Sequence, residues 1–129
     1  MPEILDLEAI RGFLDEHLEG RVLEHVEADV PWLIRNAEGL NSLVGCRFAS
    51  VRRLGKFLIL ESDDGRLLVV NPMLTGRFTW ARSSERRRSG TCLALSFGGG
   101  HQLRYSDARR MGRWYLVGAQ ELESVPQIA

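Results

Sequence analysis

The sequence predicts a mainly β fold with flanking helices, in which two antiparallel sheets form a β-sandwich or flattened barrel. The chain has 129 residues, which is the size of one domain with a sizeable core. Apolar residues recur at helical spacing near the start, between Asp6 and Gly20. From Arg47 onward, short apolar or alternating runs are separated by turn residues. Strands at such near-regular spacing are typical of sandwiches and barrels.

An amphipathic N-terminal helix is expected directly after Pro2 and Glu3. Asp6 is a candidate N-cap for this helix, and Gly20 is a natural stop at its end. The apolar side chains between these two residues share one helical face. They are Leu7, Ile10, Phe13, Leu14 and Leu18. A short second helix is expected over residues 36–44.

Strands are expected in most of the remaining chain. Their predicted ranges are 47–54, 57–62, 66–71, 76–81, 91–97, 101–106 and 112–117. Asp64-Gly65 indicates a tight hairpin, and the three glycines at 98–100 indicate a looser one. Residues 82–90 hold four arginines among serines, so we expect an exposed basic loop there.

Charge is distributed unevenly along a chain whose formal net charge is zero. Residues 1–40 contain three arginines against ten acidic residues, whereas residues 41–113 contain fourteen basic residues against five acidic ones. The middle of the chain could therefore meet a polyanion while the beginning faces away. All but one of the basic residues are arginine, whose planar fork suits bidentate contacts to phosphates and bases.

Composition also excludes several classes of protein. No apolar run approaches the roughly 18 residues of a membrane span, and the N-terminus is acidic rather than signal-like. We therefore expect no membrane partner and a cytoplasmic location. Cys46 and Cys92 are single and far apart, and with only three histidines beside them no zinc-ligand spacing exists. The sequence predicts no metal site in this chain.

The N-terminal amine is the first candidate for chemistry. Initiator methionine is normally removed before proline, which leaves Pro2 as a free secondary amine beside Glu3. Such an amine has a pKa of about 7.7–8.0, against about 10.4 for lysine, so it can be an uncharged nucleophile near neutral pH. It could attack a carbonyl carbon and form an iminium, with Glu3 supplying proton transfers. Lys56 is the only lysine in the chain.

Three further segments combine basic side chains with turns. Residues 52–57 place basic side chains beside a tight glycine turn, residues 71–77 have apolar side chains at their tip, and residues 105–114 mix arginines with Met111. Exposed apolar tips flanked by arginines are what a protein needs to wedge into a base stack while holding phosphates. Core filling is the alternative interpretation for the apolar side chains.

Together these segments resemble the N-terminal catalytic domain of the Fpg/Nei family, the formamidopyrimidine-DNA glycosylases and endonuclease VIII-type enzymes. The opening MPEILDLEAIRGFL is similar to the family's MPELPEVETIRRGL, and VRRLGKFLILESDDGRLLVVN to its VRRRGKYLLLELDDGLLIVHL. NPMLTGR is similar to HLGMTGR, and LRYSDARRMGRW to LRYTDPRRFGRW. The resemblance covers positions 2–114. It implies two antiparallel sheets with flanking helices and base-excision repair of damaged double-stranded DNA.

The resemblance also implies a role for each matched residue. Pro2 would attack the anomeric sugar carbon of a flipped nucleotide, displacing the oxidised base and leaving a Schiff base, while Glu3 would shuttle protons. The enzyme would thus be a bifunctional DNA glycosylase and AP lyase. Lys56 would hold a phosphate near the lesion. Arg109 would fill the gap left by the flipped nucleotide, and Arg110 would bind a phosphate.

The loop at 71–77 departs from the family's pattern. When the glycine-arginine pair at 76–77 fixes the alignment, Leu74 becomes the wedge residue and Asn71 replaces the family's histidine. In the later loop, Met111 replaces the family's wedge phenylalanine. Both wedges stay apolar, so insertion into DNA remains possible with less stacking.

The opening motif departs from the pattern as well. Leu5 replaces a proline, and Asp6 is shorter than the family's glutamate. Asp6 and Glu8 match carboxylates of this motif, which would shape the site around the N-terminus. The motif is closer to that of the formamidopyrimidine-type enzymes, so we expect an oxidised purine as the lesion.

Residues 1–118 are predicted to be the catalytic domain and residues 119–129 the start of an interdomain linker. Family members continue into a helix-two-turn-helix domain and usually a zinc finger, both absent from this chain. We therefore expect a fragment of a longer protein or a stand-alone domain. The family's zinc would lie in the absent part, so no cofactor is expected here. The sequence does not indicate an oligomeric state.

Two alternatives come from other classes of protein. The first is a DNA-binding domain without competent catalysis, which would bind DNA in a salt-sensitive way and form no covalent intermediate. The second is an N-terminal-proline tautomerase acting on small keto acids. Those enzymes place the proline on a strand, whereas the pattern after Pro2 is helical.

Overall fold

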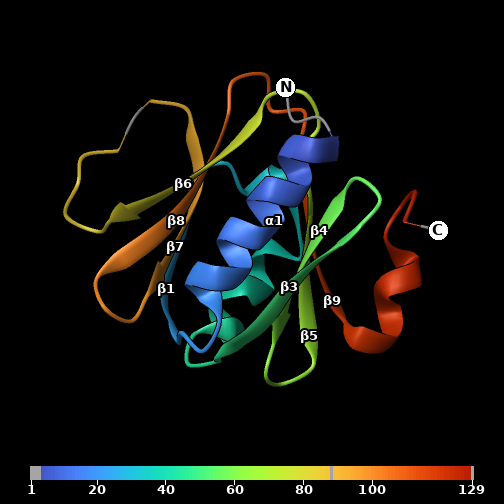
Figure 1. Ribbon diagram of the computed structural model, residues 1–129, viewed down its shortest axis with the longest axis horizontal. Coiled ribbons are helices and arrows are strands. Elements are labelled where there is room, and N and C mark those ends of the chain that lie inside the picture. Colours follow the sequence, from blue (N-terminus) through green and yellow to red (C-terminus); the bar gives the residue numbers. More distant parts are fainter. Residues whose placement is uncertain (1–3, 88, 129) are drawn as a thin grey trace.

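The structure is a computed structural model that describes residues 4–87 and 89–128 (Figure 1). One helix, α1 (Ile4–Leu18), precedes two sheets that face each other. The first sheet has the strand order β1-β7-β8-β6 and the second the order β2-β9-β5-β4-β3. The strands are β1 (Leu23–Ala28), β2 (Ile34–Arg35), β3 (Phe48–Leu54), β4 (Phe57–Ser62), β5 (Arg66–Asn71), β6 (Gly76–Arg82), β7 (Thr91–Phe97), β8 (His101–Asp107) and β9 (Arg113–Gly118).

The predicted sandwich is confirmed, with three corrections. Each sheet keeps two edge strands in the described part of the chain, so neither closes into the flattened barrel offered as the other possibility. Neighbouring strands run antiparallel except for β2 and β9, which form a short parallel pair. Strands β1 and β2 were not predicted, because β1 carries charged residues at Glu24, His25 and Glu27 and β2 has only two residues.

The predicted helical segments need correction too. Helix α1 begins at Ile4, so Asp6 lies inside its first turn and is not the N-cap. Three short 3₁₀ segments follow: η1 (Pro31–Leu33), η2 (Ala37–Leu43) and η3 (Ala119–Ser124). The second helix expected over residues 36–44 is therefore η2. Gly20 does end the first helical segment, with a φ of 77° that favours glycine.

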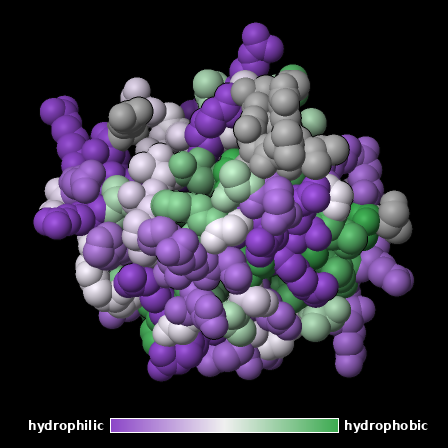
Figure 2. All heavy atoms as spheres, viewed as in Figure 1, coloured by the Kyte–Doolittle hydropathy of each residue, from purple (hydrophilic) through white to green (hydrophobic). Residues whose placement is uncertain are grey.

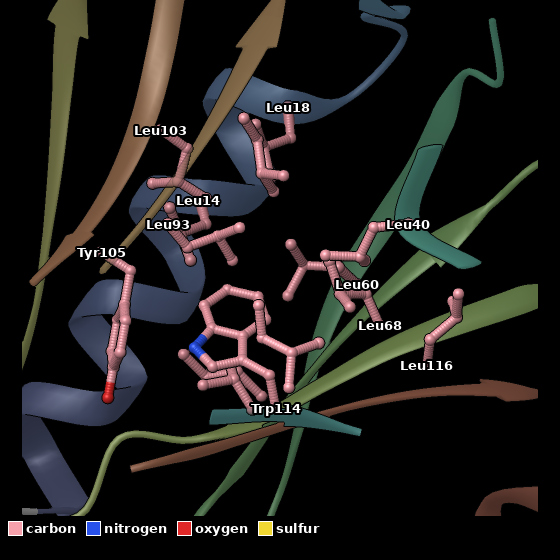
Figure 3. Close-up of a cluster of buried hydrophobic side chains, with 14 of the residues drawn as sticks. Leu14, Leu18, Leu40, Leu60, Leu68, Leu93, Leu103, Tyr105, Trp114 and Leu116 are labelled. Atoms are coloured by element: carbon pink, nitrogen blue, oxygen red, sulfur yellow. The ribbon is translucent and has the colours of Figure 1, made fainter. Parts of the chain in front are cut away.

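The main core lies between the two sheets and beneath α1. Helix α1 contributes Leu7, Leu14 and Leu18, which pack with inward side chains from both sheets. Figure 3 shows Trp114 and Tyr105 in the same cluster as Leu14 and Leu18, so that β8 and β9 supply the largest core side chains. Polar side chains cover much of the face seen in Figure 2, as the separation of core and surface requires.

A second apolar cluster lies on the outer face of the five-stranded sheet. Strands β4 and β5 direct alternate side chains to the two faces, which explains why both are continuous apolar runs in the sequence. Their outer side chains pack against Val125 and Ile128, in the segment after η3. They are Phe57, Ile59, Leu67 and Val69. Much of the segment predicted to begin the linker thus covers a sheet face.

Helix α1 also covers the exposed edge of strand β3. The Arg11 guanidinium donates to the Val51 carbonyl at 3.2 Å, and the Val51 amide donates to the Asp15 carboxylate at 2.8 Å. These bonds satisfy backbone groups of an edge strand that would otherwise be free to pair with another chain. None of the helices in the described residues is long and apolar enough to cross a membrane.

Candidate functional site

The predicted nucleophile Pro2 and its partner Glu3 lie outside the described residues. Helix α1 begins at Ile4, directly after them in the chain. The side chain of Asp6 is likewise outside the described set. Figure 1 shows the start of α1 at the end of the molecule where the β5–β6 loop (72–75) and the β8–β9 loop (108–112) are also drawn. The described part of the candidate site is built from these two loops and the β3–β4 hairpin.

The β5–β6 loop presents two apolar side chains to solvent. Met73 is 41% exposed and Leu74 is 45% exposed, so the predicted wedge residue does not fill the core. Asn71 is buried at the end of β5, and its side-chain oxygen accepts a hydrogen bond from the Met73 amide at 3.1 Å. Met73 has a φ of 52°, a left-handed conformation that this bond helps to hold. Asn71 therefore shapes the loop that carries Leu74.

The β8–β9 loop carries the other predicted DNA contacts. Arg109 and Arg110 are exposed, and Met111 is half-buried. Arg110 has a φ of 52°, and its amide donates to the Asp107 carbonyl at 3.2 Å in a turn. The Arg113 guanidinium then donates to the Arg110 carbonyl at 2.9 Å and the Gly112 carbonyl at 2.7 Å. The backbone of this loop is thus fixed at several points, while two arginine side chains stay in solvent.

A buried carboxylate, Asp107, joins the two loops. It is 1% exposed and accepts hydrogen bonds from the Tyr105 hydroxyl at 2.7 Å, from the Gly112 amide at 2.8 Å and from the Thr75 hydroxyl. Thr75 ends the β5–β6 loop, and Gly112 ends the β8–β9 loop. Three donors to one buried carboxylate therefore fix the position of the two loops relative to each other.

The ionisation of this cluster follows from its surroundings. Burial by itself would raise the pKa of Asp107, but hydrogen bonds from Thr75, Tyr105 and the Gly112 amide outweigh it and hold the pKa below its ordinary value. Burial, together with the Asp107 carboxylate, raises the pKa of Tyr105 far above its usual range. Asp107 thus stays an acceptor near neutral pH while Tyr105 stays a donor.

Two glycines let the loops approach the Tyr105 hydroxyl closely. A Cβ atom on Gly112 would overlap the Tyr105 oxygen and lie 2.9 Å from the Asp107 carboxylate. A Cβ on Gly76 would lie 2.6 Å from the same hydroxyl and 2.5 Å from the Pro72 carbonyl. Neither position has room for a side chain. The glycines that follow the two predicted wedges are therefore required by packing around one phenol.

The β3–β4 hairpin places Lys56 in solvent. Leu54 pairs with Phe57, so Gly55 and Lys56 form a two-residue turn, and Gly55 has a φ of 61°. The turn is connected to helix α1 through Arg53, which donates to the Gly55 carbonyl at 3.1 Å and to the Glu8 carboxylate at 3.0 Å. The helix after the N-terminal residues and the predicted phosphate-binding lysine are therefore linked by one arginine.

Glu8 is a connecting residue in this arrangement. Its carboxylate also accepts from the Arg11 guanidinium at 2.6 Å. The hydrogen bonds from Arg11 and Arg53 hold the pKa of Glu8 below its ordinary value. The negative charge of Glu8 thus joins α1 to the hairpin, and its supporting role at the N-terminus stays a prediction.

Elsewhere, some of the acidic charge is paired. Arg87 from the predicted basic loop binds Glu27 at 2.8 Å and Asp29 at 3.3 Å. Within residues 4–87 and 89–128, by contrast, no ion pair involves Lys56, Arg109 or Arg110. The positive charges of the β3–β4 hairpin turn and of the β8–β9 loop therefore have no carboxylate partner among the described side chains. The described side chains include no group of three or more His, Cys, Asp or Glu that could hold a metal ion.

Sequence reasoning missed two parts of this site. The sequence did not single out Asp107, although an acidic residue directly before a basic loop is a signal for a hydrogen-bond acceptor. The sequence did not single out Trp32 either, which is 63% exposed. It follows Pro31 in η1 and lies beside Arg113, the first residue of β9. Its signal was a tryptophan directly after Pro31, in a segment where no strand or helix was predicted.

Comparisons with known proteins agree with this geometry. The family model of the formamidopyrimidine-DNA glycosylase N-terminal domain matches residues 1–114. The formamidopyrimidine-DNA glycosylase of Desulforamulus reducens is 33% identical over 132 residues, covering 99% of this chain and 48% of that protein. The enzyme of the same name from Moorella thermoacetica is 31% identical over 98% of this chain and 47% of its own length. The chain thus spans about half the length of these relatives.

Solved structures give the same result. A Lactococcus lactis Fpg bound to DNA containing FAPY-dG superposes with a TM-score of 0.90 and 27% identity, over 95% of this chain and 46% of that one. A MutM in complex with carbocyclic 8-oxo-G containing DNA gives a TM-score of 0.89 and 26% identity, over 95% and 47%. The two-sheet fold with its N-terminal helix is therefore that of the N-terminal half of these proteins.

Proposed function

Since this chain belongs to the formamidopyrimidine-DNA glycosylase family through its N-terminal domain, we propose that it carries the chemistry of a base-excision DNA repair enzyme. In this proposal it acts on damaged double-stranded DNA as a glycosylase and AP lyase. The observation that best supports this proposal is that Asp107 joins the β5–β6 and β8–β9 loops. Together these loops present apolar and arginine side chains to solvent. Such a pair suits insertion into a base stack while phosphates are held.

The covalent steps begin at the uncharged amine of Pro2. Its nitrogen attacks C1′ of the flipped nucleotide, the glycosidic bond breaks as the new bond forms, and the departing base takes up a proton. Opening of the sugar ring gives an iminium between the proline nitrogen and C1′. Loss of a proton from C2′ then expels the 3′ phosphate and cuts the strand. Glu3 carries protons between the sugar positions.

The described loops supply the binding side of the proposal. Leu74 and Met111 enter the base stack, and Arg109 fills the space that the flipped nucleotide leaves. Arg110 and Lys56 bind phosphates as cations in solvent. Support comes from the exposure of Leu74, Lys56 and both arginines. Asn71 acts mainly by holding the β5–β6 loop through the Met73 amide.

The proposed lesion is an oxidised purine. Relatives bear the name formamidopyrimidine-DNA glycosylase, and similar structures hold DNA containing FAPY-dG or carbocyclic 8-oxo-G. The relatives are bacterial proteins, so the proposed place of action is the bacterial cytoplasm, at the nucleoid. Any zinc finger of the family would lie in the half of the relatives that this chain does not span.

The experiment is borohydride trapping of the chain on a duplex with one abasic site, followed by peptide mass mapping of the adduct. A second duplex with 8-oxo-G tests base release. The chain has one lysine and one terminal amine, so the adduct has two possible positions. We expect it at Pro2. The K56R variant keeps the positive charge and removes the only side-chain amine, so it should still give the Pro2 adduct.

Each contrary result has a definite meaning. An adduct at Lys56 overturns the choice of Pro2 as the nucleophile. Loss of the trapped adduct in the K56R variant overturns it as well. DNA binding without any adduct, with the mature N-terminus confirmed by intact mass, overturns the catalytic proposal for this chain and leaves a DNA-binding domain.

A further inference from the structure

An open hollow of about 200 Å³ lies beside the start of strand β9. Its lining comes from η1, β2 and β9 and consists of Trp32, Leu33, Arg35, Arg113, Trp114 and Tyr115. Leu33 and Trp114 are each 1% exposed and belong to the core. The accessible part of the hollow is therefore two arginines and two aromatic rings. None of these residues was singled out by the sequence as functional.

The aromatic rings and guanidinium groups of the hollow are paired with one another. The Arg113 guanidinium carbon lies 5.5 Å from the centre of the Trp32 ring, and that of Arg35 lies 6.0 Å from the centre of the Tyr115 ring. In the described part of the chain, neither arginine forms an ion pair with a carboxylate. An exposed indole that shares a hollow with two cations without acidic partners fits an anionic ligand that also has a flat face.

The hollow is continuous with the β8–β9 loop. Strands β2 and β9 run parallel, with Ile34 opposite Trp114 and Arg35 opposite Tyr115. Arg113 both contacts the Trp32 ring and donates to the Arg110 carbonyl at 2.9 Å. One side chain thus belongs to the hollow and to the base of the loop proposed to enter DNA. A ligand held by that loop would extend past Trp32.

We infer that the hollow is a second DNA contact, in which Arg35 and Arg113 bind a backbone phosphate and Trp32 stacks on a base that is unstacked next to the lesion. The inference rests on the proposed function, because it extends the same DNA past the β8–β9 loop. Phosphate charge complements the two guanidinium groups, which have no carboxylate partner among the described side chains, and any unstacked base offers a face to an indole whatever the sequence. The contact strengthens DNA binding but does not distinguish one lesion from another.

The test is fluorescence anisotropy with a labelled duplex holding one abasic-site analogue, over a series of salt concentrations. We expect W32A to bind about tenfold more weakly, while W32F stays close to the unmodified chain, since stacking tolerates any aromatic ring. R35Q should lower the slope of log affinity against log salt by up to about 0.9, the amount for one phosphate, because Arg113 stays beside the same phosphate. Trp32 and Arg35 are both exposed, so neither change threatens the fold, which circular dichroism verifies.

Two further variants separate this inference from the proposed function. R82Q removes an exposed positive charge at the opposite end of β6 from Gly76 and should leave affinity and slope unchanged. R109Q removes a charge from the β8–β9 loop. Weakening in R109Q with no effect of W32A and R35Q overturns the second contact and leaves the proposed function standing. No DNA binding by the unmodified chain overturns both.

Two other results also overturn the inference. Equal losses in R35Q and R82Q would mean that only overall charge matters. Dissociation of a dimer by W32A in light scattering, with unchanged DNA binding, would assign the hollow to contact with a second copy of this chain.

Discussion

Arg53 joins helix α1 to the β3–β4 hairpin by donating its Nε hydrogen to the Glu8 carboxylate at 3.0 Å. The same guanidinium donates to the Gly55 carbonyl beside Lys56. The helix that follows Pro2 and Glu3 is thus tied to the proposed phosphate-binding turn. Such a link would fix the position of the proposed nucleophile relative to the phosphate that Lys56 is proposed to bind.

Replacing Glu8 by glutamine should slow borohydride trapping several-fold and change the thermal midpoint little. The pair is half-exposed, and exposed ion pairs contribute little to stability. Its loss would instead loosen the hairpin against the helix. The pKa of Glu8 is lowered, so the link is intact at neutral pH and is lost only as pH falls through that lowered pKa. E16Q, on an exposed position of the same helix, is the matched control. Equal slowing in both variants would contradict the role of Glu8.

Replacing Asp107 by asparagine should destabilise the protein by about 2–4 kcal/mol, because three donors lose a buried charged acceptor. The pKa of Asp107 is lowered by folding. Its contribution is therefore complete above the ordinary pKa of about 3.9 and disappears as pH falls through the lower folded value. Urea unfolding at pH 7 and near pH 3 measures both effects.

Two features of that experiment make it decisive. The difference between D107N and the unmodified chain should shrink at the lower pH. The exposed D63N keeps the oxygen that accepts the Arg47 amide, so it should shift the midpoint little. A D107N variant as stable as D63N at pH 7 would show that Asp107 does not hold the loops.

Replacing Gly112 by alanine should cost about 1–3 kcal/mol of stability by overpacking. The added Cβ meets the Tyr105 hydroxyl first, so the cost should fall by about 1 kcal/mol in a Y105F background, the size of coupling expected between residues in contact. A double-mutant cycle from urea unfolding measures the coupling. G12A, a helix position with nothing within 4 Å of the new Cβ, should instead stabilise the chain by about 1 kcal/mol. Additive effects of G112A and Y105F would refute the close approach.

Replacing Val125 by aspartate should destabilise the fold and expose the outer face of the five-stranded sheet. Val125 is 2% exposed against Phe57 and its neighbours, so a charge there has no partner in the cluster. Thermal melting and binding of a hydrophobic dye report the two effects. S124D, at the exposed neighbouring position, should change neither. Identical behaviour of the two variants would mean that the segment after η3 does not cover the sheet in solution.

Much of the fold could be predicted from the sequence, since the seven predicted strands lie within one residue of those observed. Their apolar runs are bounded by turn residues such as Gly55 and Gly65, and both adopt positive φ. Strand β1 escaped prediction because it is an edge strand whose outward positions are charged. Asp6 was wrongly assigned as the N-cap, because the acidic preference of the first helical turn resembles that of a cap.

The candidate site was predictable only in part. Side chains that reach solvent from loops, such as Leu74 and Arg109, follow from motif and composition. The buried link through Asp107 does not, because Thr75 and Asp107 are 32 residues apart and meet only where the ends of β6 and β8 pair. Trp32 and Arg113 meet only through the parallel pairing of β2 with β9, for which a two-residue strand gives no sequence signal.

The carboxylate shared by the two loops has a consequence for how the molecule would search DNA. Loops fixed to each other before DNA arrives form a probe of constant shape, and little ordering entropy remains to be lost on contact. Discrimination between an intact and a damaged base pair would then come from how readily the duplex itself opens and kinks against that probe. The protein would test how easily each base-pair step deforms, and a lesion would be found where the DNA duplex opens most readily.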